Sequence, residues 1–265
     1  MRKFSVCVTL CLSILLLTLT ASVAFAQGTP SSKATAAINT SVGCVVRGTS
    51  NIGDPVPIDC HDIFSGNSVN VTPDNFAEIM KTTVKVSNSQ SLFVSPSLVT
   101  GLYTNTRVKG SPGTTSTATA MGGVYMRAVL KDGAGNVVKV AYPVAVCTPD
   151  ILGCQADSNN NFGVILDSRV QTLTQTISDC VVNAGTVTGT CTFDSTIGLI
   201  LQTTSAHTFN LIFPSVGVGT YTVSIQAAVK ADGTIGGTAT AIGAAAFGLG
   251  SVTVESVRLV RDFSF

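Results

Sequence analysis

Charged and aromatic side chains are scarce in this sequence. Only 11% of the 265 residues are Asp, Glu, Lys or Arg, against roughly 25% in ordinary globular domains. Trp is absent, and there are only two His. Lys and Arg (15) nearly balance Asp and Glu (14), so the chain lacks the broad basic field with which proteins bind nucleic acid. Hydrophobic residues make up 45%, which excludes a disordered chain, because disorder requires low hydrophobicity.

The motifs of several enzyme classes are also missing. No G-x-S-x-G nucleophile elbow occurs, and the glycines of Gly217-Val-Gly219 are not followed by the Lys-Ser/Thr of a phosphate-binding loop. Since Glu78 and Glu255 are the only glutamates, paired carboxylates for glycoside hydrolysis would have to come almost wholly from Asp. We therefore expect a protein that is not an enzyme.

The first 26 residues have the pattern of a secretory signal peptide. Arg2 and Lys3 form the positive start, residues 6–20 the apolar stretch, and Ala24-Phe-Ala26 a small-x-small cleavage site. Cleavage would leave 239 residues with a net charge of −1. We expect an exported bacterial protein that is located in the periplasm, at the cell surface or outside the cell.

Six cysteines follow the predicted signal peptide. An even number in an exported chain favours disulfides over metal or redox chemistry, and the spacings are too wide for a zinc site. Neighbouring cysteines along the chain are expected to pair, each pair closing a loop or a hairpin end. The predicted disulfides are Cys44–Cys60, Cys147–Cys154 and Cys180–Cys191.

Apolar and polar residues alternate with a period of two in several segments, as in half-buried strands. The strands predicted in this way cover residues 68–72, 83–87 and 251–260. Val124–Val146 predicts a hairpin, because glycines in the segment 132–136 supply the positive φ of a turn.

A second hairpin and one short helix are predicted from weaker signals. The hairpin covers residues 220–240 and turns at Asp232-Gly233. The helix covers residues 73–81, about two turns, with Thr72 as its N-cap and acidic residues in its first turn.

Short strands separated by Gly, Pro, Asp and Asn, with almost no helix between them, predict an all-β fold. We expect a disulfide-stapled antiparallel β-sandwich or jelly-roll-like fold with at most one short helix. Residues 27–38 are small and polar and would form a flexible mature N-terminus. Residues 39–265 would then form one large domain, or two lobes dividing near residues 147–160.

Residues 233–254 contain no charged side chain. The segment is rich in Gly, Ala and Thr rather than strongly apolar, so it predicts tightly packed strands that approach another sheet or subunit closely, and not a membrane span. The last nine residues resemble the closing strand of a bacterial outer-membrane barrel. That barrel is kept as an alternative.

Two polar segments are candidate sites. A His between acids could act as a base or bind a metal, so Asp59, His61 and Asp62 are candidate ligand contacts and the basis of a hydrolase alternative; the other interpretation is a Pro-stiffened loop anchored by Cys60. Oxygen ligands at alternate positions make Asp157, Asn159 and Asn161 a calcium candidate, although the EF-hand pattern is not met. An ordinary polar loop is the alternative. The second histidine, His207, is expected at a polar strand end.

The leading interpretation is a secreted, non-enzymatic β-sandwich protein with a structural, adhesive or surface-assembly role. Its partner would be another copy of the chain or a surface glycan, with no nucleic acid, no stable membrane span and no cofactor other than calcium. The alternative is a carbohydrate- or ligand-binding module, calcium-assisted if residues 157–161 bind the ion. Its candidate contacts are Tyr103, Tyr125, Tyr142 and Phe64, for which core packing is the competing explanation.

Overall fold

The computed structural model describes residues 33–52, 68–69, 76–143, 163–178 and 195–258. Within these ranges every regular element is a β-strand, and the strands form two sheets whose pairings are antiparallel apart from a two-residue parallel contact. The prediction of an all-β antiparallel fold is confirmed. None of the described residues forms a helix able to cross a membrane.

The first sheet has seven strands in the order β10-β5-β12-β2-β3, with β1 beside β12 and β9 beside β5. Its strands are β1 (Ala34–Asn39), β2 (Val42–Ser50), β3 (Ser68–Val69), β5 (Gln90–Gly110), β9 (Ser195–Thr208), β10 (Leu211–Val216) and β12 (Ala239–Val257).

The second sheet has five strands in the order β4-β11-β6-β7, with β8 also beside β6. Its strands are β4 (Ala77–Val86), β6 (Thr114–Lys131), β7 (Val137–Val140), β8 (Val164–Ile177) and β11 (Gly219–Gly236). Strand β6 precedes residues 147–160 in the chain, yet it lies between β8 and β11, which follow them. Strands from both halves of the sequence therefore share one sheet.

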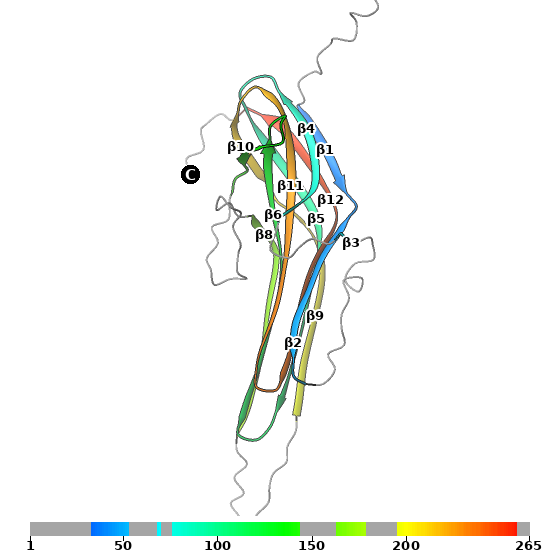
Figure 1. Ribbon diagram of the computed structural model, residues 1–265, viewed down its shortest axis with the longest axis vertical. Coiled ribbons are helices and arrows are strands. Elements are labelled where there is room, and N and C mark those ends of the chain that lie inside the picture. Colours follow the sequence, from blue (N-terminus) through cyan, green and yellow to red (C-terminus); the bar gives the residue numbers. More distant parts are fainter. Residues whose placement is uncertain (1–32, 53–67, 70–75, 144–162, 179–194, 259–265) are drawn as a thin grey trace, which may run out of the picture.

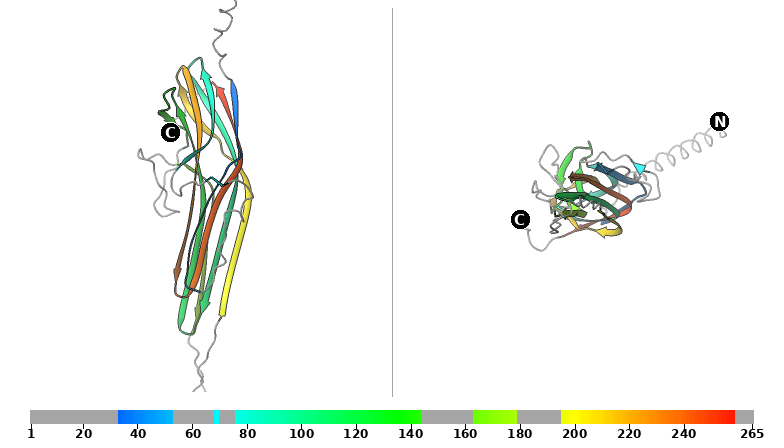
Figure 2. Two further views of the ribbon diagram at one scale, coloured as in Figure 1. Left: turned by 45° about the vertical axis from the view of Figure 1, so that its right-hand side comes forward. Right: turned by 90° about the horizontal axis from the view of Figure 1, so that it is seen from below.

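The two sheets face each other, and their strands run along the length of an elongated body (Figures 1 and 2). Strand β5 has 21 residues, which corresponds to about 70 Å of extended chain. The lower half in Figure 1 is a narrow projection, here called the arm, formed where the longest strands extend beyond β4 and β10. By strand register the arm comprises residues 44–50, 101–110, 114–122, 170–177, 195–204, 231–236 and 239–246.

The upper half has a core of large apolar side chains contributed by both sheets. Leu92, Leu98 and Phe247 come from the first sheet, and Met126 and Ile225 from the second, and all are fully buried. Burial of each such side chain contributes about 2 kcal/mol, so this half holds the main hydrophobic core.

The arm is packed instead with small side chains. Its central cluster contains Val108 and four buried alanines from β6 and β12. The backbones are so close that a Cβ on Gly122 would lie 2.6 Å from the carbonyl oxygen of Ala244, and a Cβ on Gly243 would overlap the carbonyl of Met121. The predicted close approach of residues 233–254 to another sheet is confirmed.

The predicted hairpin around residues 132–136 is confirmed. Strands β6 and β7 flank a turn in which Gly135 has a φ of 87°. The Asp132 carboxylate accepts bonds from the backbone amides of Asn136 and Ala134, each at 2.9 Å. The Asn136 amide contributes most to lowering the pKa of Asp132, so the carboxylate stays ionised and holds the turn.

Two local predictions are wrong. In the predicted helix 73–81, residues 77–81 are the start of β4, which pairs with β11 and buries Met80. Asp232 and Gly233 do not form a turn but continue β11, and the chain reverses at Gly237, whose φ is 70°. In both cases pairing with a distant strand outweighs the local signal.

Of the three predicted strands, residues 83–86 belong to β4 and residues 251–257 to β12, which confirms both. Residues 68–69 form β3, and residues 70–72 lie outside the described residues.

Candidate functional site

Most of the site candidates from the sequence lie outside the described residues. These are Asp59, His61, Asp62, Phe64, Asp157, Asn159 and Asn161, together with Cys60, Cys147, Cys154, Cys180 and Cys191. Cys44 is half-buried in β2, and Cys60, with which it is predicted to pair, lies outside the described residues. The three pairings therefore stay predictions.

The three candidate tyrosines have different surroundings. Tyr103 packs with Ile242 of β12 in a small apolar cluster and is only 8% exposed. Tyr125, on β6, is 7% exposed and packs against Phe76. Tyr142 is 37% exposed and lies beside β10, bonded through its backbone to Ile212. A ligand on the surface needs an exposed ring, so Tyr142 is the candidate that keeps this role among the three.

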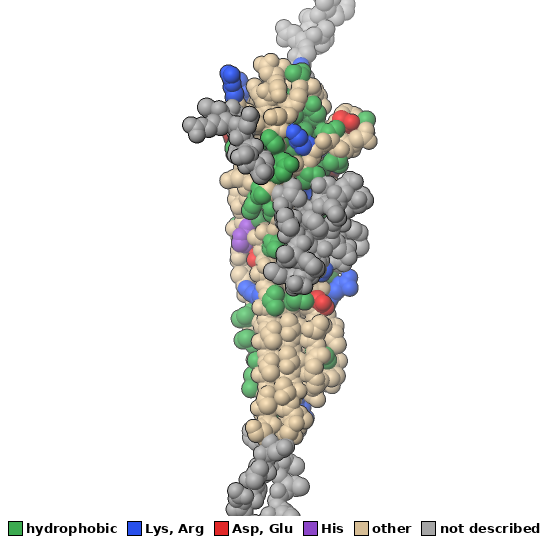
Figure 3. All heavy atoms as spheres, turned by 90° about the vertical axis from the view of Figure 1, so that its left-hand side faces the viewer, with side chains coloured by type: hydrophobic (Ala, Val, Ile, Leu, Met, Phe, Trp, Pro, Cys, Tyr) green, Lys and Arg blue, Asp and Glu red, His purple; other side chains and the backbone are tan. Residues whose placement is uncertain are grey.

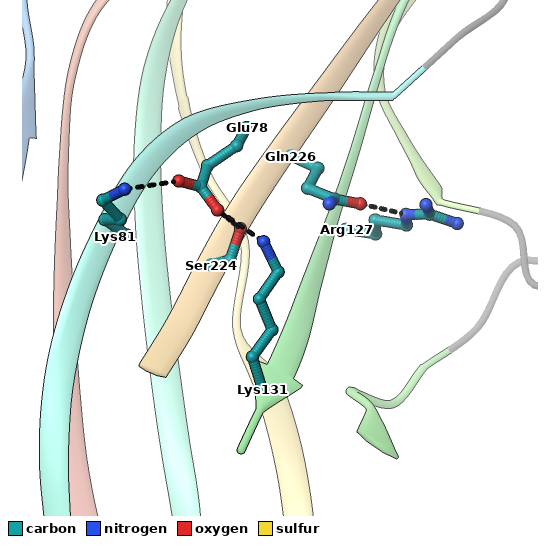
Figure 4. Close-up of polar contacts among 6 residues, drawn as sticks. All are labelled: Glu78, Lys81, Arg127, Lys131, Ser224 and Gln226. Carbon is teal, nitrogen blue, oxygen red and sulfur yellow. Dashed lines mark hydrogen bonds and ion pairs between the residues drawn. The ribbon is translucent and has the colours of Figure 1, made fainter. Parts of the chain in front are cut away.

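A cluster of charged side chains lies on the second sheet, around Glu78 of β4 (Figure 4). Its carboxylate lies 2.7 Å from the Lys131 ammonium and 3.1 Å from that of Lys81. The Ser224 hydroxyl donates to the same carboxylate at 2.6 Å. Three adjacent strands, β4, β11 and β6, therefore supply the four side chains.

The surroundings of Glu78 hold it in the charged form. Partial burial is the largest single influence and acts to raise its pKa, but the hydrogen bonds from Lys131, Ser224 and Lys81 together outweigh it and lower the pKa from 4.5 to about 2. A carboxylate with so low a pKa is a poor general base near neutral pH. Glu78 therefore stays ionised in this cluster and is not suited to proton transfer.

The cluster borders a hollow of about 550 Å³ between β4 and the β6–β7 turn. Two ammonium groups, two carboxylates and several threonine hydroxyls surround it, which suits a neutral polar molecule better than an ion of either sign. Its lining residues are Glu78, Lys81, Thr82, Thr83, Lys131, Asp132, Gly133, Gly135 and Thr222.

Arg127 continues this polar surface along β6. Its Nε donates to the Gln226 side-chain oxygen at 2.7 Å (Figure 4), and its guanidinium lies 4.4 Å from the centre of the Phe76 ring. The guanidinium and the ring form a cation–π contact, so Arg127 has a structural role here.

A second group of polar side chains joins β8 to the first sheet, and we call it the polar seam. Gln171 is its centre: it accepts from the Thr104 hydroxyl at 2.7 Å and donates to Thr106 at 2.6 Å and to the Leu199 carbonyl at 2.8 Å. All the bonds of this buried amide run to the opposite sheet, so Gln171 fixes how the sheets lie against each other. Further members are Asp167, Arg169, Gln175, Thr100, Ser195, Thr203 and His207.

His207 lies at the upper end of the polar seam. Its Nε2 is 3.4 Å from the Asp167 carboxylate, which also accepts from the Thr100 hydroxyl at 2.6 Å. In nucleophilic catalysis the hydroxyl must bond to the imidazole that removes its proton. Here the hydroxyl bonds to the carboxylate instead, so this arrangement joins β5, β8 and β9 and does not activate Thr100.

The described residues bring together no group of three or more His, Cys, Asp or Glu side chains that could hold a metal ion.

Sequence reasoning did not find the Glu78 cluster or the polar seam. The signal for the seam is present, because Asp167, Arg169, Gln171 and Gln175 occupy alternate positions of one strand and so share a face. The Glu78 cluster leaves no comparable trace, because its members come from β4, β6 and β11.

No protein-family model and no curated protein matches this chain. Its function is therefore inferred from its own residues and geometry.

Proposed function

We propose that the chain is an exported, non-enzymatic, disulfide-stapled β-sandwich protein that acts as a structural or adhesive component at a bacterial surface. The arm carries this proposal. Its long paired strands pack through small side chains into a narrow extension. Such a shape is better suited to contact with a distant partner than to the enclosure of a substrate.

The outer face of the arm supports a contact role. Thr115, Thr117 and Thr119 of β6 each pair with a threonine of β8, with hydroxyl oxygens 3.1 to 3.3 Å apart. Ladders of threonines stabilise a sheet from its exposed face and give a surface of hydroxyl and methyl groups. Charged side chains are sparse on the face of the lower half that Figure 3 shows.

Surface labelling tests this proposal. Intact cells that express the full chain should bind an antibody against it and attach to a substratum more than cells without it. The control is Leu15→Arg, which places a charge in the apolar stretch of the predicted signal peptide. A chain that is labelled only after lysis, with attachment unchanged, would contradict the proposal.

A second candidate is a carbohydrate-binding module, favoured by the hollow beside Glu78 and its threonine hydroxyls. A glycan array probed with and without chelator distinguishes it from a purely structural protein. A specific glycan signal that Lys81→Ala removes would favour the module, and loss of that signal with chelator alone would assign binding to a calcium site.

A further inference from the structure

Strand β9 is a long edge strand with exposed apolar side chains. It pairs with β5 over its whole length. Ile197, Leu199, Ile200 and Leu201 are 42 to 59% exposed. Three of them, all but Ile200, lie opposite buried residues of β5 that face the second sheet. Hydrophobic side chains follow one margin of the arm in Figure 3, and β9 lies at the outer margin in the left view of Figure 2.

Strand β9 lacks the features that usually protect an edge. Soluble proteins prevent edge pairing with charged residues, proline, bulges or short strands. The 14 residues of β9 include no Asp, Glu, Lys, Arg or Pro, and their register with β5 is unbroken. Among the other described edge strands, β4 and β8 carry charged residues, β10 has Pro214 and a bulge, and β1 is only six residues long. A long, regular, uncharged edge is suited to further pairing.

The backbone of β9 also presents groups for another strand. Just beyond β9, the Phe209 amide donates to the Pro96 carbonyl of β5. Antiparallel pairs alternate between bonded and non-bonded positions, so the odd-numbered residues of β9 bond to β5. The peptide groups of Gly198 and Ile200 therefore point away from β5, toward the outer edge of the sheet.

We propose that β9 pairs antiparallel with β9 of a second copy of this chain, about a two-fold axis at Leu199. This register places Ile197 opposite Leu201 and Leu199 opposite its own copy, so each apolar side chain of this face meets another. The strand has no charged residue, so self-pairing brings no like charges together. A two-fold axis requires such a self-complementary patch.

The size of the contact suits a reversible dimer. An axis at Leu199 pairs residues 195–203 of the two copies, which is about 30 Å of strand in a sheet about 10 Å thick. The pairing therefore buries about 600 Å² in total, the size of a weak contact. The first sheets of two copies would form one continuous sheet. This inference rests on the proposed surface-assembly function and names its partner as a second copy of the chain.

Sedimentation velocity of the purified full chain over a concentration series tests the pairing. The wild type should form dimers in a concentration-dependent way. Leu199→Lys places two ammonium groups opposite each other and should raise the dissociation constant about tenfold or more. The control is Leu249→Lys, the same change at a position of β12 that is 62% exposed, and it should leave the dissociation constant unchanged.

Charge exchange tests the register. Ile197→Lys and Leu201→Glu should each weaken the dimer about tenfold, whereas the double variant should restore it, because the ammonium group introduced in one copy then faces the carboxylate introduced in the other. The two positions are four residues apart in an extended strand, about 13 Å, so they cannot pair within one chain. Restored dimerisation also shows that the substituted strand still folds.

Three results would overturn the inference: a wild type that stays monomeric at every concentration, a dimer unaffected by Leu199→Lys, or single variants that the double variant does not rescue. These outcomes are separate from failure of the proposed function. A monomer that still labels the cell surface and promotes attachment would refute β9 pairing alone, whereas a dimer that never reaches the surface would refute the surface role alone.

Discussion

Glu78 shows how single side chains contribute to this fold. Its pKa is lowered from 4.5 to about 2 by three hydrogen bonds that outweigh partial burial. The folded state therefore binds this proton less readily than the unfolded chain, and the ionised carboxylate stabilises the fold at pH values above about 4.5. That contribution falls as the pH drops from about 4.5 to about 2.

Glu78→Gln should lower the free energy of unfolding by about 1 kcal/mol at pH 7, a value reduced for solvent screening. The difference from the wild type should shrink below pH 4.5 and vanish near pH 2. Urea unfolding over this pH range measures it. Glu255→Gln, at an exposed position of β12, is the control, and a Glu78→Gln effect that persisted at pH 2 would point to lost packing instead of lost charge.

The tyrosines show what residue type alone could not predict. Tyr125 lies in the predicted hairpin 124–146 and Tyr103 lies in no predicted element. Residue type also does not show which face of a strand is covered. Burial of both rings depends on residues of β12 and β11 that are more than 100 positions away. Their core position could not be derived from their own segments.

At the scale of elements, the contact between β6 and β12 depends on glycine. A Cβ at Gly243 would overlap the backbone of Met121, which cannot move without shifting β6. Gly243→Ala should therefore lower the free energy of unfolding by about 1–3 kcal/mol, as overpacking usually does. Urea unfolding measures the change.

Gly236→Ala is the matched control for Gly243→Ala. Gly236 is exposed in β11, and a Cβ there would meet nothing within 4 Å. Its free energy of unfolding should change by less than about 0.5 kcal/mol. If both variants lost the same free energy of unfolding, the loss would come from strand propensity and not from close packing.

Strands and turns were predicted correctly where the local sequence pattern agreed with the strand pairing in the fold. The hairpin at residues 132–136 has its turn glycine and two alternating flanks, so local and global signals coincide. Asp232-Gly233 has the same local turn signal, yet Gly233 is needed where β11 approaches Ala241 closely. A glycine can form a turn or allow two strands to approach closely, and the residues around it do not show which of the two it does.

At the scale of the whole molecule, the three predicted disulfides would each close a loop between cysteines that are neighbours along the chain. Non-reducing peptide mapping should recover Cys44–Cys60, Cys147–Cys154 and Cys180–Cys191. Reducing the Cys44–Cys60 pair should cost about 3 kcal/mol, the value for a loop of about 15 residues. A peptide that links Cys44 to Cys180 would contradict local pairing, and a reduced sample is the control.

The sequence by itself determined the all-β class and the closely packed character of residues 233–254. Alternation with a period of two and runs of small residues are properties of adjacent positions, so they can be seen without the fold. Low charge led to the expectation that sheet surfaces are covered by neighbours, and the proposed pairing of β9 names an edge at which this can be tested.

Only the tertiary structure decided which strands become neighbours, which glycines allow the two sheets to approach closely, and which of the described strands lie at an edge. The bond from Thr104 to Gln171 joins residues 67 positions apart, and the Glu78 cluster joins β4 to β11 across 146 positions. Such contacts depend on how the sheets assemble, because pairing energy is gained only when distant strands meet in one register.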